Sequence, residues 1–269
     1  MKFFIGYSNI TKNLTNLDKY YSTLNINDND TFKEILIKLN IHKKYIENKE
    51  IFKNDIYYES TIDASASYNF EENKIYINAG YMNLPFYDIN LISSINFGSI
   101  GFILGHEMAH AFDNFGINYN NKWNNNLNDN IYDDKIKCFI YQYDKYISLK
   151  TNKKINGLRT LNENLADNVG LEVAVKAYIK YINYNKLDEP SIPGYEKYNK
   201  LQLFYIAFGQ THCSYMSYIN ELKQIEKGLH SIEYYRVIGT ISNQENFHKS
   251  FHCNNTLPMN PINKCKFWN

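Results

Sequence analysis

Two histidines and a glutamate in the run His106-Glu107-Met108-Ala109-His110 are the residues whose types and spacing most directly indicate chemistry. Residues four apart lie on one face of a helix, so both imidazoles would point the same way and Glu107 would project from the adjoining face. Imidazole nitrogens bind zinc, and a carboxylate beside the metal can take a proton from an attacking water. The run therefore predicts a zinc site on His106 and His110, with Glu107 as its general base.

A catalytic zinc site needs a third protein ligand, whose identity separates the classes of zinc peptidase. The longer motif of metzincins would need glycine at position 113 and histidine at position 116, but the chain has Asp113 and Gly116, which excludes that class. Asp129 has the spacing of an aminopeptidase ligand, but it lies in an asparagine-rich stretch. We favour Glu163, near the start of a predicted helix; a capping box with Thr160 is the alternative role for this glutamate.

Two aspartates are spaced so that each could hydrogen-bond to a ligand imidazole. Asp167 follows Glu163 by four residues, on the same helical face, and Asp113 follows His110 by three. A carboxylate that accepts a hydrogen bond from a ligand imidazole fixes the tautomer of the ring. We expect each aspartate to hold one imidazole; a solvated surface carboxylate is the alternative for both.

Hydrophobic periodicity predicts the elements that would position these residues. Alternation on either side of a short polar turn predicts a β-hairpin before the zinc-binding run, and helical spacing predicts helices elsewhere. An asparagine-dominated stretch at 114–130 lacks periodicity and is predicted to be a loop. The predicted strands cover 66–70 and 74–78, and the predicted helices cover 97–112, 131–146, 160–178 and 195–219, with two or three more between 5 and 59.

Composition excludes several other functions. The chain of 269 residues carries 29 Lys and Arg against 28 Asp and Glu, so its charge does not favour nucleic acid as a partner. No stretch approaches the roughly 20 apolar residues that span a bilayer, so we expect no membrane-spanning segment in this chain. The four cysteines form no C-x-x-C pair, which argues against a cysteine zinc site and leaves disulfides or free thiols.

Further short motifs, in order along nearly the whole chain, resemble the neprilysin and endothelin-converting-enzyme family of zinc endopeptidases. They are Ile5-Gly6-Tyr7, Ala66-x-Tyr68, Asn73-x-Ile75, Ala79-Gly80, Pro85-Phe86, Asn96-Phe97-Gly98-x-Ile100-Gly101, His106-Glu107-x-x-His110-x-Phe112-Asp113, Glu163-Asn164-x-Ala166-Asp167-Asn168, Gln202-Leu203-Phe204, His230-Ser231, Arg236-Val237-x-Gly239-Thr240, Pro258-Met259-Asn260-Pro261 and Lys264-Cys265-Lys266-x-Trp268.

The resemblance implies a mainly α (α+β) fold, namely a thermolysin-like zincin catalytic lobe with a small β-hairpin or sheet beside the zinc-binding helix. It implies one zinc ion per chain on His106, His110 and Glu163. It also implies roles for two residues that no short motif singles out. His230 would stabilise the oxyanion of the tetrahedral intermediate, and Arg236 would hold a backbone carbonyl of the substrate.

The resemblance further implies a substrate site for oligopeptides cleaved on the amino side of hydrophobic residues. Ser65 replaces an asparagine that clamps the substrate backbone, Thr211 and His212 replace a Val-Trp pair in the pocket after the scissile bond, and Gly228 replaces an acidic residue two positions before the oxyanion histidine. We expect the first substitution to weaken the backbone contact, the second to make the pocket less uniformly apolar, and the third to affect the orientation of the His230 imidazole. The substrate-binding residues implied are Ser65, Ala66, Phe86, Phe102, Ile103, Thr211, His212 and Arg236.

For the cysteines, the resemblance implies a disulfide between Cys138 and Cys265 and leaves Cys213 and Cys253 without their usual partners. We expect an extracellular protein or the ectodomain of a membrane-anchored one, because structural disulfides persist in oxidising compartments. We expect 1–269 to form a single catalytic lobe, with 1–60 as a helical lead-in and 61–269 as the zinc peptidase core. The N-terminal lobe of the family is expected to be absent, leaving the cleft open or covered by a partner chain.

A different class of function is compatible with the same residues. The substitution at Ser65 and the expected absence of a second lobe favour an inactive zinc-binding homologue that acts as a peptide- or partner-binding module. The intact Glu107 favours a zinc-dependent endopeptidase, which is our main prediction.

Overall fold

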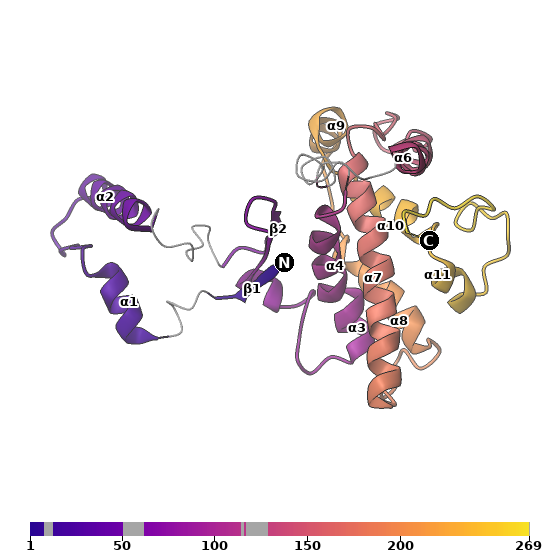
Figure 1. Cartoon of the computed structure of the whole chain (residues 1–269), viewed down its shortest axis with the longest axis horizontal. Coiled ribbons are helices and arrows are strands. Elements are labelled where there is room, and N and C mark those ends of the chain that lie inside the picture. The colour runs from indigo at the N-terminus through magenta and orange to yellow at the C-terminus, as the bar shows by residue number, and fades with distance from the viewer. Residues whose placement is uncertain (8–12, 51–61, 114–115, 117–128, 269) are drawn as a thin grey trace.

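The computed structural model describes residues 1–7, 13–50, 62–113, 116 and 129–268. It is mainly helical with one small sheet, as predicted (Figure 1). Two helices, α1 (Leu14–Tyr21) and α2 (Phe32–Glu50), stand apart from the main body on the far side of the sheet (Figure 1). They confirm the helical segments predicted between 5 and 59.

The sheet has three strands in the order β1-β3-β2. The antiparallel pair β2 (Ala66–Asn69) and β3 (Lys74–Asn78) confirms the predicted hairpin. Strand β1 (Lys2–Gly6) pairs in parallel with β3 and was not predicted, because its partner lies about seventy residues away and no local pattern reveals such a pairing. All five residues of β3 are buried, whereas those of β2 are half-buried, so β3 is the strand that anchors the hairpin.

The predicted zinc-binding helix is two helices, α3 (Ser93–Gly98) and α4 (Ile100–His110). The chain turns at Ser99, whose φ and ψ are −102° and −89°. The Ser99 hydroxyl lies 2.6 Å from the Phe86 carbonyl and 2.8 Å from that of Ile95, so it bonds where the helix ladder is interrupted. The break separates α3 from α4, and α4 carries both candidate histidine ligands.

Helix α4 crosses the long helix α7 (Leu161–Asn185) at a pair of glycines. A Cβ on Gly105 would lie 2.5 Å from the Gly170 carbonyl oxygen, and a Cβ on Gly170 would lie 2.5 Å from the His106 nitrogen. Both distances are too short for any side chain, so only glycines allow this approach. The contact brings His106 against α7 and sets the geometry of the site.

Helix α7 runs through the middle of the helical body (Figure 1) and belongs to both hydrophobic clusters of the described residues. Its Leu165 packs in the cluster that also contains Phe139, and its Leu171 packs in the cluster that contains Phe102. The surrounding elements are the 3₁₀ turn η1 (Ala79–Met82) and the helices α6 (Asp129–Tyr143), α8 (Lys200–Thr211), α9 (Tyr218–Lys227), α10 (Glu233–Ile241) and α11 (Glu245–Ser250).

The single helix predicted over 195–219 is wrong. Asn199 forms a capping box with Gln202 and begins α8, which ends at Thr211; Ser217 then caps the separate helix α9. Local apolar spacing continues across the break, whereas the cap residues stop and restart the helices. Most of the loop predicted at 114–130 lies outside the described residues.

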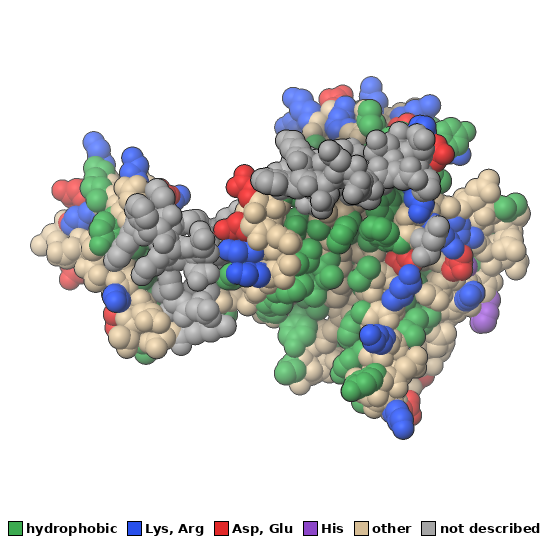
Figure 2. All heavy atoms as spheres, viewed as in Figure 1, with side chains coloured by type: hydrophobic (Ala, Val, Ile, Leu, Met, Phe, Trp, Pro, Cys, Tyr) green, Lys and Arg blue, Asp and Glu red, His purple; other side chains and the backbone are tan. Residues whose placement is uncertain are grey.

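Charges of both signs are mixed on the surface. Basic and acidic side chains lie interspersed on the face shown in Figure 2. Among the described residues, no helix combines the length and the apolar character that crossing a membrane requires.

A disulfide joins Cys138 of α6 to Cys265 near the end of the described chain, which confirms the predicted pairing. Cys213 and Cys253 are free thiols. The disulfide closes a loop with a sequence separation of 127 residues, and a cross-link of this kind restricts the unfolded chain.

Removing the disulfide is expected to destabilise the protein. Replacing Cys138 and Cys265 together with alanine should lower the free energy of unfolding by about 2–4 kcal/mol, measured by urea denaturation. The matched control is Cys213→Ala, which removes an exposed free thiol and should change stability by less than about 0.5 kcal/mol. Equal stability of the double variant and the wild type would contradict the expectation.

Candidate active site

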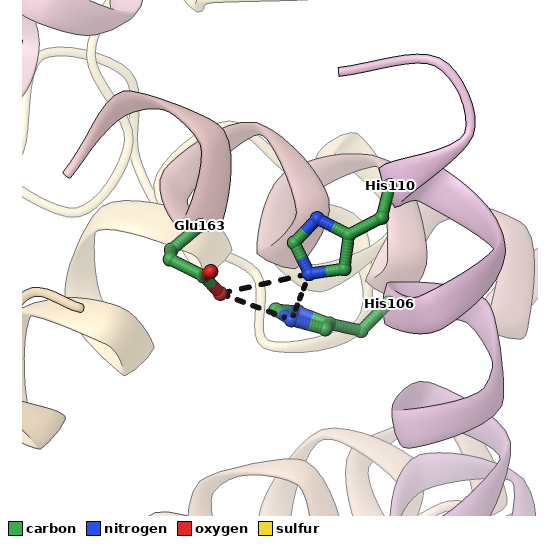
Figure 3. Close-up of side chains that lie close together, drawn as sticks. All are labelled: His106, His110 and Glu163. Carbon is green, nitrogen blue, oxygen red and sulfur yellow. Dashed lines mark hydrogen bonds and ion pairs between the residues drawn. The ribbon is translucent and has the colours of Figure 1, made fainter. Parts of the chain in front are cut away.

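Three side chains from α4 and α7 converge on one point (Figure 3). His106 and His110 lie one turn apart on α4, and Glu163 lies in the first turn of α7. The Nε2 atoms of the two histidines are 3.1 Å apart. Oε2 of Glu163 lies 3.2 Å from Nε2 of His106 and 3.7 Å from Nε2 of His110. The structure thus brings together the three residues predicted as metal ligands.

Asp167 and Asp113 each contact one imidazole on its Nδ1 side, away from the converging Nε2 atoms. Nδ1 of His106 is 2.8 Å from Oδ1 of Asp167, and Nδ1 of His110 is 2.8 Å from Oδ2 of Asp113. Asp167 is fully buried and Asp113 nearly so. Because a carboxylate can only accept, each imidazole donates from Nδ1, which leaves Nε2 as the nitrogen that could bind a metal ion.

This donor set fits a zinc ion. Two imidazole lone pairs and one carboxylate oxygen face one another, and Oε2 of Glu163 is buried without a well-aligned hydrogen bond among the described residues. Such a group of electron-rich atoms is unfavourable unless a cation lies between them. Two histidines and one glutamate are a known ligand set of catalytic zinc.

The neighbouring charges shift the pKa values of His106 and Asp167. Burial lowers the pKa of His106, but the carboxylates of Asp167 and Glu163 outweigh it and raise the pKa to about 10. Burial raises the pKa of Asp167, but Arg236 and His106 outweigh it and lower the pKa well below its ordinary value. The carboxylates around His106 therefore favour positive charge at this site.

Glu107 lies beside this point and is not one of the converging groups. It is 7% exposed, and burial raises its pKa, while His106 and His110 act in the opposite direction. A carboxylate with a raised pKa is better suited to accept and return a proton than an ordinary glutamate. Its position and environment suit a general base.

The converging residues and Glu107 line an open cleft of about 330 Å³. Strand β2 forms one wall of it, and Ala66, predicted as a substrate contact, lies there. The residues lining the cleft that sequence reasoning did not propose for the site are Ser67, Tyr68, Phe70 and Asn162. Alternation along β2 puts Ala66 and Tyr68 on one face, so this pattern could have indicated Tyr68. It does not identify Ser67 or Asn162.

Arg236 makes its hydrogen bonds to Asp167. Its Nε and Nη2 atoms donate over 2.8 and 2.7 Å to the two carboxylate oxygens, and the pair is largely buried. The guanidinium therefore supports the aspartate that holds His106. Its contact with substrate stays a prediction.

His230 extends to the converging point from the connection between α9 and α10. Its Nε2 lies 2.9 Å from Oε2 of Glu163, and its side chain is 44% exposed. An exposed imidazole at the edge of the cleft is accessible to a ligand. Its role at the oxyanion stays a prediction.

Two other residues predicted to contact substrate, Phe102 and His212, are buried. Phe102 has no exposed surface and packs edge-on against Phe208 and His212. His212 is buried and pairs through Nδ1 with Oε2 of Glu233 at 2.6 Å, beside a second cavity of about 420 Å³. A ligand would reach Phe102 only by displacing the residues that cover it.

Four predicted substrate contacts remain. Ser65 accepts a hydrogen bond from Asn78 over 2.5 Å, and the Thr211 hydroxyl donates to the Phe208 carbonyl. Phe86 and Ile103 are half-buried. Their contact with substrate stays a prediction.

A helix with the His-Glu-x-x-His pattern, joined by a glutamate from a second helix, defines the class of glutamate-liganded zinc peptidases. A family model described as "Peptidase family M13" matches residues 65–267. The chain belongs to peptidase family M13.

Curated relatives agree with this assignment. The chain is 34% identical to "Neprilysin-11" of Caenorhabditis elegans over 98% of its own length and 32% of that protein. It is 32% identical to "Neprilysin" of Homo sapiens over 98% of its own length and 36% of that protein. The chain thus spans about a third of the length of the curated relatives it matches.

Solved structures share the fold. The "Haemonchus galactose containing glycoprotein complex" matches with a TM-score of 0.83 and 25% identity, over all of this chain and 45% of that one. The zinc metalloprotease Zmp1 of Mycobacterium tuberculosis matches with a TM-score of 0.80 and 23% identity, over all of this chain and 41% of that one. The second likeness supports the fold alone.

Proposed function

We propose that the chain is the catalytic part of a zinc endopeptidase that cleaves oligopeptides. The observation that carries the proposal is the convergence of the ring nitrogens of His106 and His110 with Glu163, with Glu107 buried outside this ligand group and lining the same cleft. Membership of peptidase family M13 supports the same reaction.

His106, His110 and Glu163 would hold the zinc, and Asp167 and Asp113 keep the Nε2 lone pairs directed at it. Bound there, zinc supplies a Lewis acid that polarises the scissile carbonyl and makes a water molecule more acidic. Asp167 also accepts hydrogen bonds from Arg236, so a single carboxylate orients both His106 and the Arg236 guanidinium.

Glu107 takes the proton of the attacking water and returns it to the leaving amine nitrogen. His230 donates a hydrogen bond to the oxygen that becomes negative as the carbonyl carbon becomes tetrahedral. Arg236 binds a backbone carbonyl of the peptide. The Cys138–Cys265 disulfide supports an extracellular location, because such bonds persist in oxidising compartments.

Cleavage on the amino side of hydrophobic residues is the finer part of the proposal. The test uses two internally quenched peptides that differ only in one position, leucine in one and aspartate in the other, with products identified by mass spectrometry. We expect cleavage of the leucine peptide before that residue, and complete inhibition by a hydroxamate chelator.

Cleavage of both peptides at equal rates would contradict the preference alone. If the zinc-loaded protein binds the peptides and leaves them intact, the endopeptidase proposal is wrong, and a peptide-binding module is supported in its place.

A further inference from the structure

From the way its neighbours are bonded, we infer that Gln224 and Ser231 are positioning residues that hold His230 beside Glu163 through the backbone. The inference rests on the proposed function, because it concerns the oxyanion role of His230. Neither residue lines the cleft at the converging side chains, so neither is a catalytic residue.

The imidazole of His230 has little support of its own. Its Nε2 lies 2.9 Å from Glu163, and nearly half of the side chain is exposed. Within the described part of the chain, no side chain hydrogen-bonds to its Nδ1. The buried ligand His106 differs, because a carboxylate holds its second nitrogen. Among the described residues, the His230 ring is therefore placed by its contact with Glu163 and by the backbone that carries it.

Gln224 anchors the backbone of His230 from the α9 side. Its side-chain Nε2 donates to the His230 backbone carbonyl over 2.8 Å. The Gln224 backbone carbonyl accepts from the Gly228 backbone nitrogen, also over 2.8 Å. A Cβ on Gly228 would lie 2.6 Å from the Gln224 carbonyl oxygen and 2.7 Å from its side-chain amide. The glycine thus leaves the space through which the amide reaches His230.

Ser231 anchors the same backbone from the α7 side. Its hydroxyl donates to Oδ1 of Asn164 over 2.9 Å and lies 3.3 Å from Oγ1 of Thr160. The Asn164 amide in turn donates to Oγ1 of Thr160 over 2.8 Å. Ser231 is 1% exposed and Asn164 is fully buried, so water cannot easily replace these bonds.

Two neighbouring contacts join the α9–α10 connection to α7: His230 with Glu163, and Ser231 with Asn164. Ser231 follows His230 and Asn164 follows Glu163 in the sequence, so the buried bond lies one residue along from the His230–Glu163 contact on both segments. This cross-link fixes the separation of the two backbones. A shift of about 1 Å at a group that stabilises the transition state can cost orders of magnitude in rate.

The first test measures steady-state kinetics of the zinc-loaded protein. Ser231→Ala and Gln224→Met should each lower kcat about tenfold, with KM and zinc content unchanged, because the bound substrate is the same and only the transition state loses a well-placed donor. In a His230→Ala background, Ser231→Ala should lower kcat no further. A further tenfold fall in that background would overturn the inference, because Ser231 would then act independently of His230.

The matched control is Ser242→Ala. Ser242 is 2% exposed and its hydroxyl donates to the Ile238 carbonyl within its own helical turn. This variant removes an equally buried hydroxyl and should leave kcat within about twofold of wild type. An equal loss of kcat in Ser242→Ala and Ser231→Ala would show a general effect of packing and overturn the inference.

The second test needs no activity. Long-range ¹H–¹⁵N spectra of the metal-free protein should show one defined set of imidazole resonances for His230 in the wild type, and broadened or shifted ones in Ser231→Ala. Unchanged His230 resonances would overturn the inference. A wild type that cleaves no peptide but shows the expected spectra would refute the proposed function while leaving the positioning by Ser231 intact.

Discussion

Replacing Glu107 with glutamine is expected to lower kcat by about three orders of magnitude while the protein keeps its full complement of zinc. The amide has the same shape as the carboxylate but cannot accept a proton, so general base catalysis is lost. Glu107 is not one of the three converging ligand groups, so metal affinity should not change. Peptide hydrolysis and zinc content by mass spectrometry measure the two effects.

Glu172→Gln is the control for this substitution. Glu172 lies on α7 and pairs with Lys176 at the surface, so its loss should leave kcat unchanged. Zinc loss in Glu107→Gln would show that the glutamate is a ligand, and an unchanged kcat would show that it is not the base. Either result contradicts the roles assigned here.

The same chemical change at Glu163 is expected to have the opposite effect on the metal. Glu163→Gln replaces the anionic ligand by a neutral amide, so zinc affinity should fall by more than about a hundredfold, which exceeds the loss usual for residues that merely support a ligand. Competition with a chromophoric chelator measures the affinity. Hydrolysis should fail at limiting zinc for this reason.

Comparison of the two glutamine variants separates binding from chemistry. Glu107→Gln should hold zinc without hydrolysis, and Glu163→Gln should lose zinc itself. Stoichiometric, tightly bound zinc in Glu163→Gln would assign the third ligand elsewhere; Asp129 is the first alternative by spacing. Far-ultraviolet circular dichroism of both variants controls for loss of fold.

The elements that carry the site could be predicted because their signals are local. Alternation identified the hairpin of β2 and β3, and the His-Glu-x-x-His spacing identified the face of α4. The spacings of Asp113 from His110 and of Asp167 from Glu163 are also local, and both aspartates lie where those spacings suggested.

What could not be predicted depends on contacts between distant segments. Nothing near Gly105 indicates that it meets Gly170 sixty-five residues later, yet this crossing brings His106 to α7. Arg236 was assigned to substrate from the resemblance alone, whereas its bonds in the structure go to Asp167, sixty-nine residues away. Such pairings follow from packing and leave no periodic signal in the sequence.

The central claim is that His106, His110 and Glu163 together hold one zinc ion. Anomalous diffraction at the zinc edge from zinc-soaked crystals tests it most directly. The account predicts one strong peak at about 2.0–2.2 Å from Nε2 of both histidines and from a carboxylate oxygen of Glu163. A peak that lacks any of these three ligands, or no peak at this site in zinc-saturated protein, would contradict it.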